Sequence, residues 1–178
     1  MSKQIVILSG SPRKNGNTEQ LVCAFQTGAE SVGHTVKIFP VAHMNIRACT
    51  GCEHCIDNPN ICAIKDDMQG VLTAIVNADI IVWASPVYYF SVTAQLKAAI
   101  DRCYPLPLDA PPKQAALLLT CADASSDTAE GALAMYRKTL EYYGWHDAGI
   151  VIATGVEHKG DIAGHEALEL AENLGQKF

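Results

Sequence analysis

Residues 4–18 read QIVILSGSPRKNGNT, and this stretch decides the fold. Its first part, residues 4–9, is a short apolar run rich in β-branched side chains, which is typical of a strand buried on both faces. A turn rich in Gly, Pro and Asn follows, and from 18 to 32 apolar residues recur at helical spacing. Asn17 is expected to cap that helix. A buried strand, a tight turn and a helix together predict the start of a βαβ unit.

The same alternation continues along the chain. Further strands are expected at 35–40, 79–84, 114–121 and 148–154, and further helices at 66–77, 91–102, 127–143 and 161–174. Because parallel strands need long crossovers, this pattern predicts an α/β fold, a doubly wound five-stranded parallel sheet with helices on both faces. Such sheets bind ligands beyond the carboxyl ends of their strands. The segments after the first, third and fourth strands are therefore the ones to search.

Composition narrows the class of protein. The chain has 178 residues, is 49% hydrophobic and 18% charged, and carries a net charge of −6, so we expect neither a disordered chain nor a nucleic-acid binder. No apolar run approaches the roughly 18 residues that would cross a membrane. The seven cysteines are an odd count without a signal-peptide pattern, which favours a cytoplasmic setting. We expect one domain over residues 1–178, with a cysteine-rich insertion at about 43–65.

The turn after the first strand gathers short hydrogen-bond donors and a guanidinium at a helix start, where free N–H groups and the helix dipole favour a phosphate. The candidates are Ser9, Ser11, Arg13, Asn15, Asn17 and Thr18. The alternative is an ordinary surface turn. The turn lacks both the nucleoside-triphosphate pattern and the dinucleotide glycine pattern, which points to a single phosphate monoester.

Two motifs carry a family resemblance. Gly10-Ser11-Pro12-Arg13 followed by Gly16-Asn17-Thr18 resembles the FMN-phosphate loop of flavodoxin-like NAD(P)H-dependent FMN reductases, and SPVYYF at 85–90 with TAQLK at 93–97 and IDR at 100–102 supports it. The resemblance covers nearly the whole chain. It implies the strand order 2-1-3-4-5, FMN at the carboxyl edge of the sheet, and NAD(P)H as co-substrate.

The loops after the third and fourth strands are the expected ring site. A flavin ring needs a flat apolar shelf and backbone donors, and the resemblance implies that the backbone of Pro86, Val87, Tyr88, Tyr89 and Phe90 supplies them, near a dimer interface. Relatives hold the other side of the ring with small residues, which here are Thr120, Cys121 and Ala122. Cys121 reads more simply as a small buried hydrophobe.

Four cysteines crowd one segment as Cys49-x2-Cys52-x2-Cys55-x6-Cys62. Thiolates suit an iron–sulfur cluster or zinc, and the third close cysteine fits zinc less well. The spacing resembles the compact motif of iron–sulfur flavoproteins, which implies a [4Fe-4S] cluster on these four residues. It departs from the bacterial ferredoxin run in its last spacing. Free thiols are the other interpretation.

These features predict an FMN-binding oxidoreductase that passes electrons from NAD(P)H through the flavin to a quinone, a flavin or another small acceptor. No catalytic side chain is assigned, because the flavin carries the chemistry. The alternative is an iron–sulfur flavoprotein electron carrier with a protein donor such as ferredoxin, and a third is a thiol- or metal-based sensor. By resemblance we expect a homodimer or homotetramer.

Overall fold

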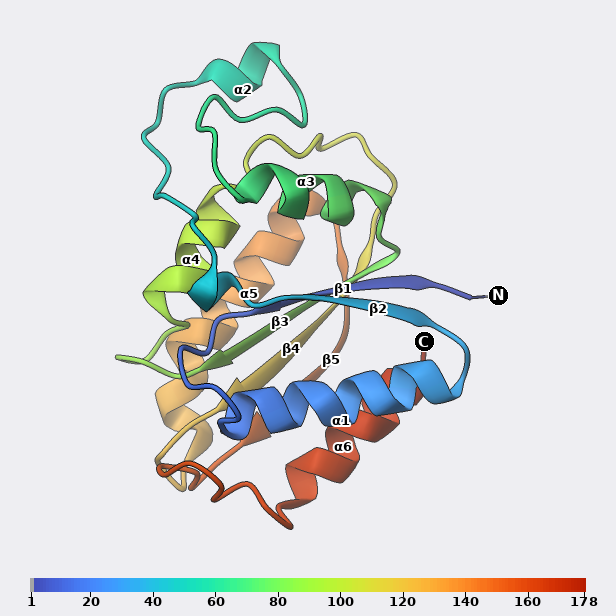
Figure 1. Ribbon diagram of the computed structural model, residues 1–178, viewed down its shortest axis with the longest axis vertical. Helices are drawn as coiled ribbons and strands as arrows, with labels where there is room; N and C mark the ends of the chain where they lie inside the picture. Colours follow the sequence, from blue (N-terminus) through green and yellow to red (C-terminus); the bar gives the residue numbers. More distant parts are fainter. Residues whose placement is uncertain (1) are drawn as a thin grey trace.

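A computed structural model describes residues 2–178, and its centre is a five-stranded parallel sheet in the order β2-β1-β3-β4-β5 (Figure 1). The strands are β1 Gln4–Ser9, β2 Thr35–Phe39, β3 Ile80–Pro86, β4 Gln114–Thr120 and β5 His146–Ala153. The longer helices are α1 Asn17–Ser31, α3 Met68–Asn77, α4 Ala94–Asp101, α5 Glu130–Tyr143 and α6 Glu166–Gln176. Three short turns of helix are η1 Val41–His43, α2 His54–Asp57 and η2 Ser126–Ala129. The predicted fold class and strand order are confirmed.

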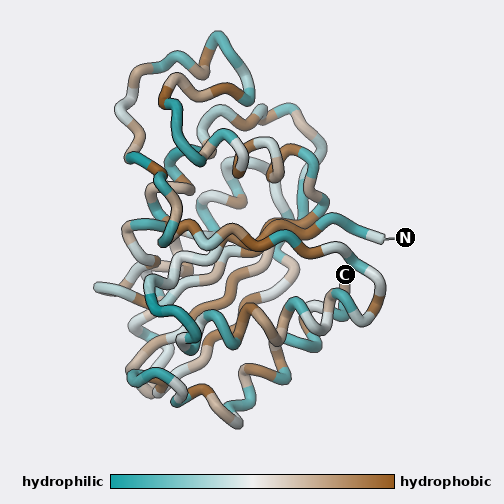
Figure 2. The backbone as a smooth tube through the Cα atoms, in the orientation of Figure 1, coloured by the Kyte–Doolittle hydropathy of each residue, from teal (hydrophilic) through white to brown (hydrophobic). Residues whose placement is uncertain are grey.

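Helices cover both faces of the sheet, α1 and α6 on one and α3, α4 and α5 on the other (Figure 1). β1 shows why: Ile5 and Ile7 belong to the core under α1 and α6, while Val6 and Leu8 belong to the core under α3 to α5. In Figure 2, hydrophobic residues, drawn in brown, run along the strands through the middle of the molecule. A continuous apolar run is thus what a strand between two helical layers requires.

Helix starts differ from the sequence expectation for local reasons. α4 begins at 94 rather than 91, because the Thr93 hydroxyl caps it by accepting the Leu96 N–H at 3.3 Å. α6 begins at 166 rather than 161, because the His165 ring accepts the Ala167 N–H at 3.0 Å. Both α4 and α6 thus begin directly after a residue whose side chain accepts a hydrogen bond from one of the first free N–H groups of the helix.

The loop between β1 and α1, residues 10–16, is fastened to its neighbours. The Gly10 N–H donates to the Ala84 carbonyl at 2.8 Å, and the Thr93 hydroxyl donates to the Gly10 carbonyl at 2.8 Å. A Cβ on Gly10 would lie 2.6 Å from the Leu96 Cβ, so only glycine fits here. The start of α4 therefore fixes the β1–α1 loop.

Within residues 2–178 no helix is long and apolar enough to span a bilayer.

Candidate functional site

A polar pocket of about 140 Å³ lies at the carboxyl edge of the sheet. Residues from four separate loops form it, as the doubly wound topology predicts. Its walls are Ser11, Arg13, Asn17, Thr18, Pro86, Val87, Tyr88, Thr120, Ala122, Val156 and Glu157. The structure thus brings together the predicted phosphate turn, the third-strand loop and the fourth-strand loop. It adds the loop after β5, residues 154–160, which the sequence reasoning left out.

Asn17 does not cap α1 as expected. Gly16 is the N-cap residue and supplies no side-chain bond, and Asn17 is the first residue of the helix. The Asn17 amide instead donates to the carbonyls of Val156 at 3.2 Å and His158 at 2.8 Å, and its oxygen accepts the Gly160 N–H at 2.9 Å. Asn17 therefore joins the start of α1 to the loop after β5 and leaves the helix start without a side-chain acceptor.

The Arg13 guanidinium lies at the rim of the polar pocket. Its Nη1 donates to the Glu157 carbonyl at 2.9 Å, and this is the one hydrogen bond of its five N–H donors that the described residues make. Deeper in the pocket the hydroxyls of Thr18 and Thr120, both buried, lie 2.8 Å apart. A guanidinium, hydroxyls and an uncapped helix start form a donor set suited to a phosphate.

The aromatic loop, residues 87–91, closes in a tight turn. Tyr88 and Ser91 exchange N–H···O bonds at 2.9 and 3.2 Å, and the two residues between them have positive φ, 46° for Tyr89 and 64° for Phe90. Non-glycine residues in that left-handed region cost about 1–3 kcal/mol each. Tyr89 is 98% exposed. Backbone strain of this kind clusters at binding sites, so the loop is a candidate part of the site.

Gly131 of α5 supports the aromatic loop from behind. A Cβ at that position would lie 2.3 Å from the Phe90 carbonyl oxygen, so the loop backbone lies directly on the helix. The sequence analysis missed Gly131, because the role of a glycine within a helical pattern becomes clear only when its neighbours in space are known.

A second hollow of about 260 Å³ adjoins the polar pocket, because Val87 and Ala122 line both. Its other walls are Tyr89, Phe90, Cys121, Asp123 and Thr128. The two hollows form one surface with polar donors at one end and an aromatic shelf at the other. That shape matches a ligand with a phosphate and a flat ring.

Two predicted residues lie elsewhere. Ser9 and Asn15 do not line the polar pocket but a neighbouring hollow of about 320 Å³, which shares Ser11 and Arg13 with it. Ser9 is buried, and the Asn15 N–H donates to the Glu19 carboxylate at 2.5 Å. Their contact with a phosphate stays a prediction.

Cys121 lines the second hollow but is 4% exposed. Burial raises the pKa of its thiol, so the neutral form is favoured. This agrees with the interpretation of Cys121 as a small buried side chain.

All four clustered cysteines line one cavity of about 390 Å³, which we call the cysteine cavity. Cys49 and Cys52 are exposed, Cys55 is half-buried and Cys62 is buried. As they stand, residues 2–178 contain no three His, Cys, Asp or Glu side chains placed to hold a metal ion. The donor chemistry nevertheless fits a thiolate-bound cluster, since four cysteines line a single cavity.

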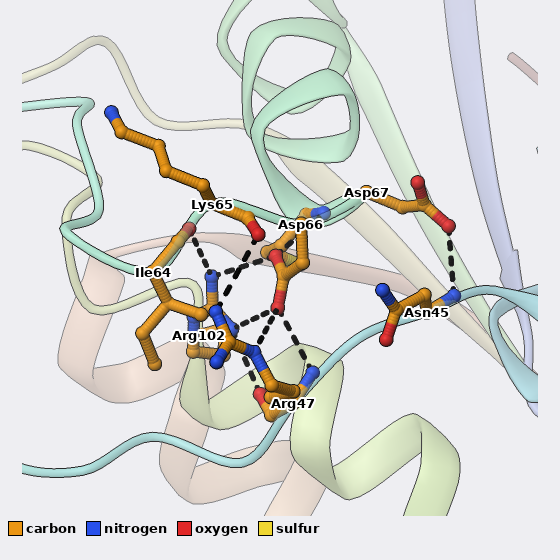
Figure 3. Close-up of polar contacts among 8 residues, drawn as sticks. Asn45, Arg47, Ile64, Lys65, Asp66, Asp67 and Arg102 are labelled. Carbon is orange, nitrogen blue, oxygen red and sulfur yellow. Dashed lines mark hydrogen bonds and ion pairs between the residues drawn. The ribbon is translucent and has the colours of Figure 1, made fainter.

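A buried ion pair holds the two ends of the cysteine segment (Figure 3). Asp66 accepts from Arg102 Nη1 at 2.8 Å and Nη2 at 3.0 Å, and the same guanidinium donates to the carbonyls of Arg47 and Ile64. Asp66 also accepts the Met68 N–H at the start of α3, as a capping residue does. Burial alone would raise the pKa of Asp66, but these hydrogen bonds lower it below its ordinary range.

Comparison with known proteins agrees with this geometry. The chain is 38% identical over 96 residues to an iron-sulfur flavoprotein of Archaeoglobus fulgidus, a match covering 54% of this chain and 43% of that one. It is 36% identical over 103 residues to an iron-sulfur flavoprotein of Methanocaldococcus jannaschii, covering 58% and 53%. The chain thus spans about half the length of the curated relatives it matches.

The fold is shared with an NAD(P)H:quinone oxidoreductase from Methanothermobacter marburgensis, at a TM-score of 0.80 and 21% identity over 99% of this chain and 96% of the other. The sequence profile of the family described as NADPH-dependent FMN reductase matches residues 4–158, which include the polar pocket, the aromatic loop and the cysteine cavity. The chain therefore belongs to the NADPH-dependent FMN reductase family.

Proposed function

We propose that this chain is an FMN-dependent oxidoreductase that takes electrons from NAD(P)H and delivers them to a quinone, a flavin or another small acceptor. The observation that carries the proposal is the continuity of the polar pocket with the aromatic shelf through Val87 and Ala122. Membership of the reductase family supports it. Bound FMN would accept hydride and hand on electrons, so the protein's part is binding and positioning.

The phosphate end is the work of the β1–α1 loop and α1. Arg13 offers a guanidinium at the rim, Ser11 and Thr18 offer hydroxyls, and the first turn of α1 offers N–H groups that no side chain caps. A dianionic phosphate gains charge-assisted hydrogen bonds from this set. Asn17 serves indirectly, by holding the loop after β5 against the helix start.

At the ring end, fewer backbone N–H groups are free to bind a ligand than the family resemblance implies. The N–H of Val87 donates to the Thr120 carbonyl at 2.8 Å, and that of Tyr88 donates to Ser91 at 2.9 Å. These two donors are therefore engaged within the protein. The turn at Tyr89 and Phe90, with Ala122 opposite, would supply the backbone donors for the ring.

The decisive experiment is anaerobic. Purified chain is titrated with FMN, and the complex is mixed rapidly with NADH or NADPH while flavin absorbance is followed. Rapid bleaching by one of the two supports the reductase, and the faster one identifies the donor. A chain that binds no FMN would refute the proposal, and bound flavin that bleaches only with a protein donor such as ferredoxin would favour the electron carrier.

A second candidate function comes from the cysteine cavity. Four cysteines that line one cavity, together with two curated relatives named iron-sulfur flavoproteins, favour a [4Fe-4S] cluster held by Cys49, Cys52, Cys55 and Cys62. Such a cluster would exchange electrons with the flavin. Chain prepared without oxygen and assayed for iron and acid-labile sulfide decides it. About four of each per chain is expected, whereas zinc alone or four titratable thiols would refute the cluster.

Oligomeric state stays a prediction. We propose a homodimer or homotetramer, and the 98% exposure of Tyr89 is consistent with a loop that another subunit covers. Sedimentation of the FMN-loaded chain measures the state directly.

A further inference from the structure

The cysteine cavity is bordered by an arginine that is almost completely buried. Arg102 follows the last residue of α4, is 1% exposed, and lines the same cavity as the four thiols. A buried guanidinium is costly unless its charge is paired and its N–H groups are bonded. Asp66 pairs the charge, and two main-chain carbonyls occupy further donors of Nη1 and Nη2.

One nitrogen of this guanidinium is left over. Among residues 2–178, Arg102 Nε is buried and has no hydrogen-bond partner. An unpartnered buried donor costs about 1–3 kcal/mol, and proteins rarely leave one without a reason. The other two nitrogens are held in a plane by Asp66, which fixes the direction of the Nε–H bond.

Of the four clustered cysteines, Cys62 is the one that is buried, as Arg102 is. Burial tends to lower the pKa of Arg102, but the hydrogen bonds that it donates to Asp66 and the neighbouring Cys62 raise it. Arg102 and Cys62 line the same cavity. Since Asp66 balances the charge of Arg102, what remains for the cavity is a directed N–H dipole.

We propose that Arg102 Nε donates a hydrogen bond to sulfur in the cysteine cavity, either the Cys62 thiolate or a sulfide beside it, and thereby raises the reduction potential of the group held there. The inference depends on the cluster put forward as the second candidate function. Hydrogen bonds to sulfur stabilise the more electron-rich state of an iron–sulfur cluster and are among the determinants of its potential.

The main test is a paired variant, Arg102→Met with Asp66→Asn, which removes the donor without leaving a buried charge unpaired. We expect the cluster to bind and its midpoint potential, followed by electron paramagnetic resonance, to move to a more negative value. A tenfold change in the equilibrium constant corresponds to about 59 mV for one electron. Arg47→Met is the matched control: Arg47 lies 3.9 Å from the same carboxylate, is 62% exposed and does not line the cavity, so the potential should stay unchanged.

A measurement on the unaltered chain covers the case in which the paired variant does not fold. Protein labelled with heavy nitrogen in its arginine side chains is reduced, and electron–nuclear double resonance is recorded on the cluster. A nitrogen coupling from one arginine is the expected result.

The outcomes separate the two ideas. Iron-free chain from anaerobic preparations would overturn both the cluster and the role of Arg102. A cluster whose potential is the same in the paired variant, or that shows no arginine coupling, would overturn the role of Arg102 and leave the cluster standing.

Discussion

Gly131 and Phe90 meet at a distance that allows no side chain between them: a Cβ on Gly131 would lie 2.3 Å from the Phe90 carbonyl oxygen. The contact joins helix α5, in one of the two outer helical layers, to the exposed aromatic loop. Because Tyr89 and Phe90 both hold positive φ, the loop needs such a support to keep its shape.

Gly131→Ala should therefore push the aromatic loop away from α5. We expect the affinity for FMN to fall by about tenfold, equal to about 1.4 kcal/mol, measured by quenching of flavin fluorescence. Gly70→Ala is the matched control, since a Cβ there meets nothing within 4 Å in α3. It should keep FMN affinity and raise stability by about 0.5–1 kcal/mol. Equal FMN affinity in both variants would contradict the role given to Gly131.

Arg13→Ala should weaken FMN but not riboflavin. The loss expected for a charge-assisted hydrogen bond is about 1.5–3 kcal/mol, and riboflavin lacks the phosphate that receives it. Titrating both flavins against both chains gives the comparison. Lys14→Ala is the control, because Lys14 is the neighbouring basic residue but does not line the polar pocket. A parallel loss of riboflavin affinity would mean that Arg13 holds the loop rather than the phosphate.

Tyr89→Asn should raise the free energy of unfolding, by about 1 kcal/mol, because asparagine tolerates the left-handed backbone that Tyr89 adopts. Urea denaturation measures the change. Tyr104→Asn serves as control, since Tyr104 is also exposed but has no positive φ. If Tyr89→Asn proves no more stable than the natural chain, the turn carries no strain.

Acid should remove the contribution of the ion pair between Asp66 and Arg102. The pKa of Asp66 is lowered in the folded chain, so its stabilisation is present above the unfolded value of about 3.9 and is lost as pH falls through the lowered pKa. Unfolding free energies of the natural chain and Asp66→Asn should therefore differ most near neutral pH, begin to approach each other at about pH 4, and converge as the pH falls further through the lowered pKa of Asp66.

The exposed pair of Lys97 and Asp101 provides the comparison. Asp101→Asn removes a surface ion pair whose side chains are about half exposed, and such pairs contribute about 0–1 kcal/mol. Its effect should be small at every pH. A difference for Asp66→Asn that stays constant from neutral pH to acid would show that the carboxylate charge is not what stabilises the segment.

Short-range patterns predicted the elements well. The apolar run at 4–9 matches β1 residue for residue, and the helix and strand alternation led to the correct parallel sheet. The fold class pointed to the segments after the first, third and fourth strands, because the carboxyl ends of neighbouring parallel strands meet at one edge. The family resemblance then named the residues of the third- and fourth-strand loops that line the polar pocket. The loop after β5 lies at the same edge of the sheet, and Gly155 could have indicated a turn there.

Contacts that depend on backbone direction or on distant partners were not predictable. Asn15 has a φ of 51°, and its backbone N–H donates to the Glu19 carboxylate. Asp66 and Arg102 are 36 positions apart and read separately as a helix start and part of a family motif. The two residues come into contact only because the cysteine segment packs over α4.

α4 carries Thr93 at one end and Arg102 at the other, so a rod of about 12 Å connects the Gly10 carbonyl to the cysteine segment. A displacement of Arg102, for example on oxidation of the neighbouring thiols, would be passed along this helix to the β1–α1 loop. We therefore expect oxidation of the cysteines and loss of bound FMN to occur together in ageing preparations.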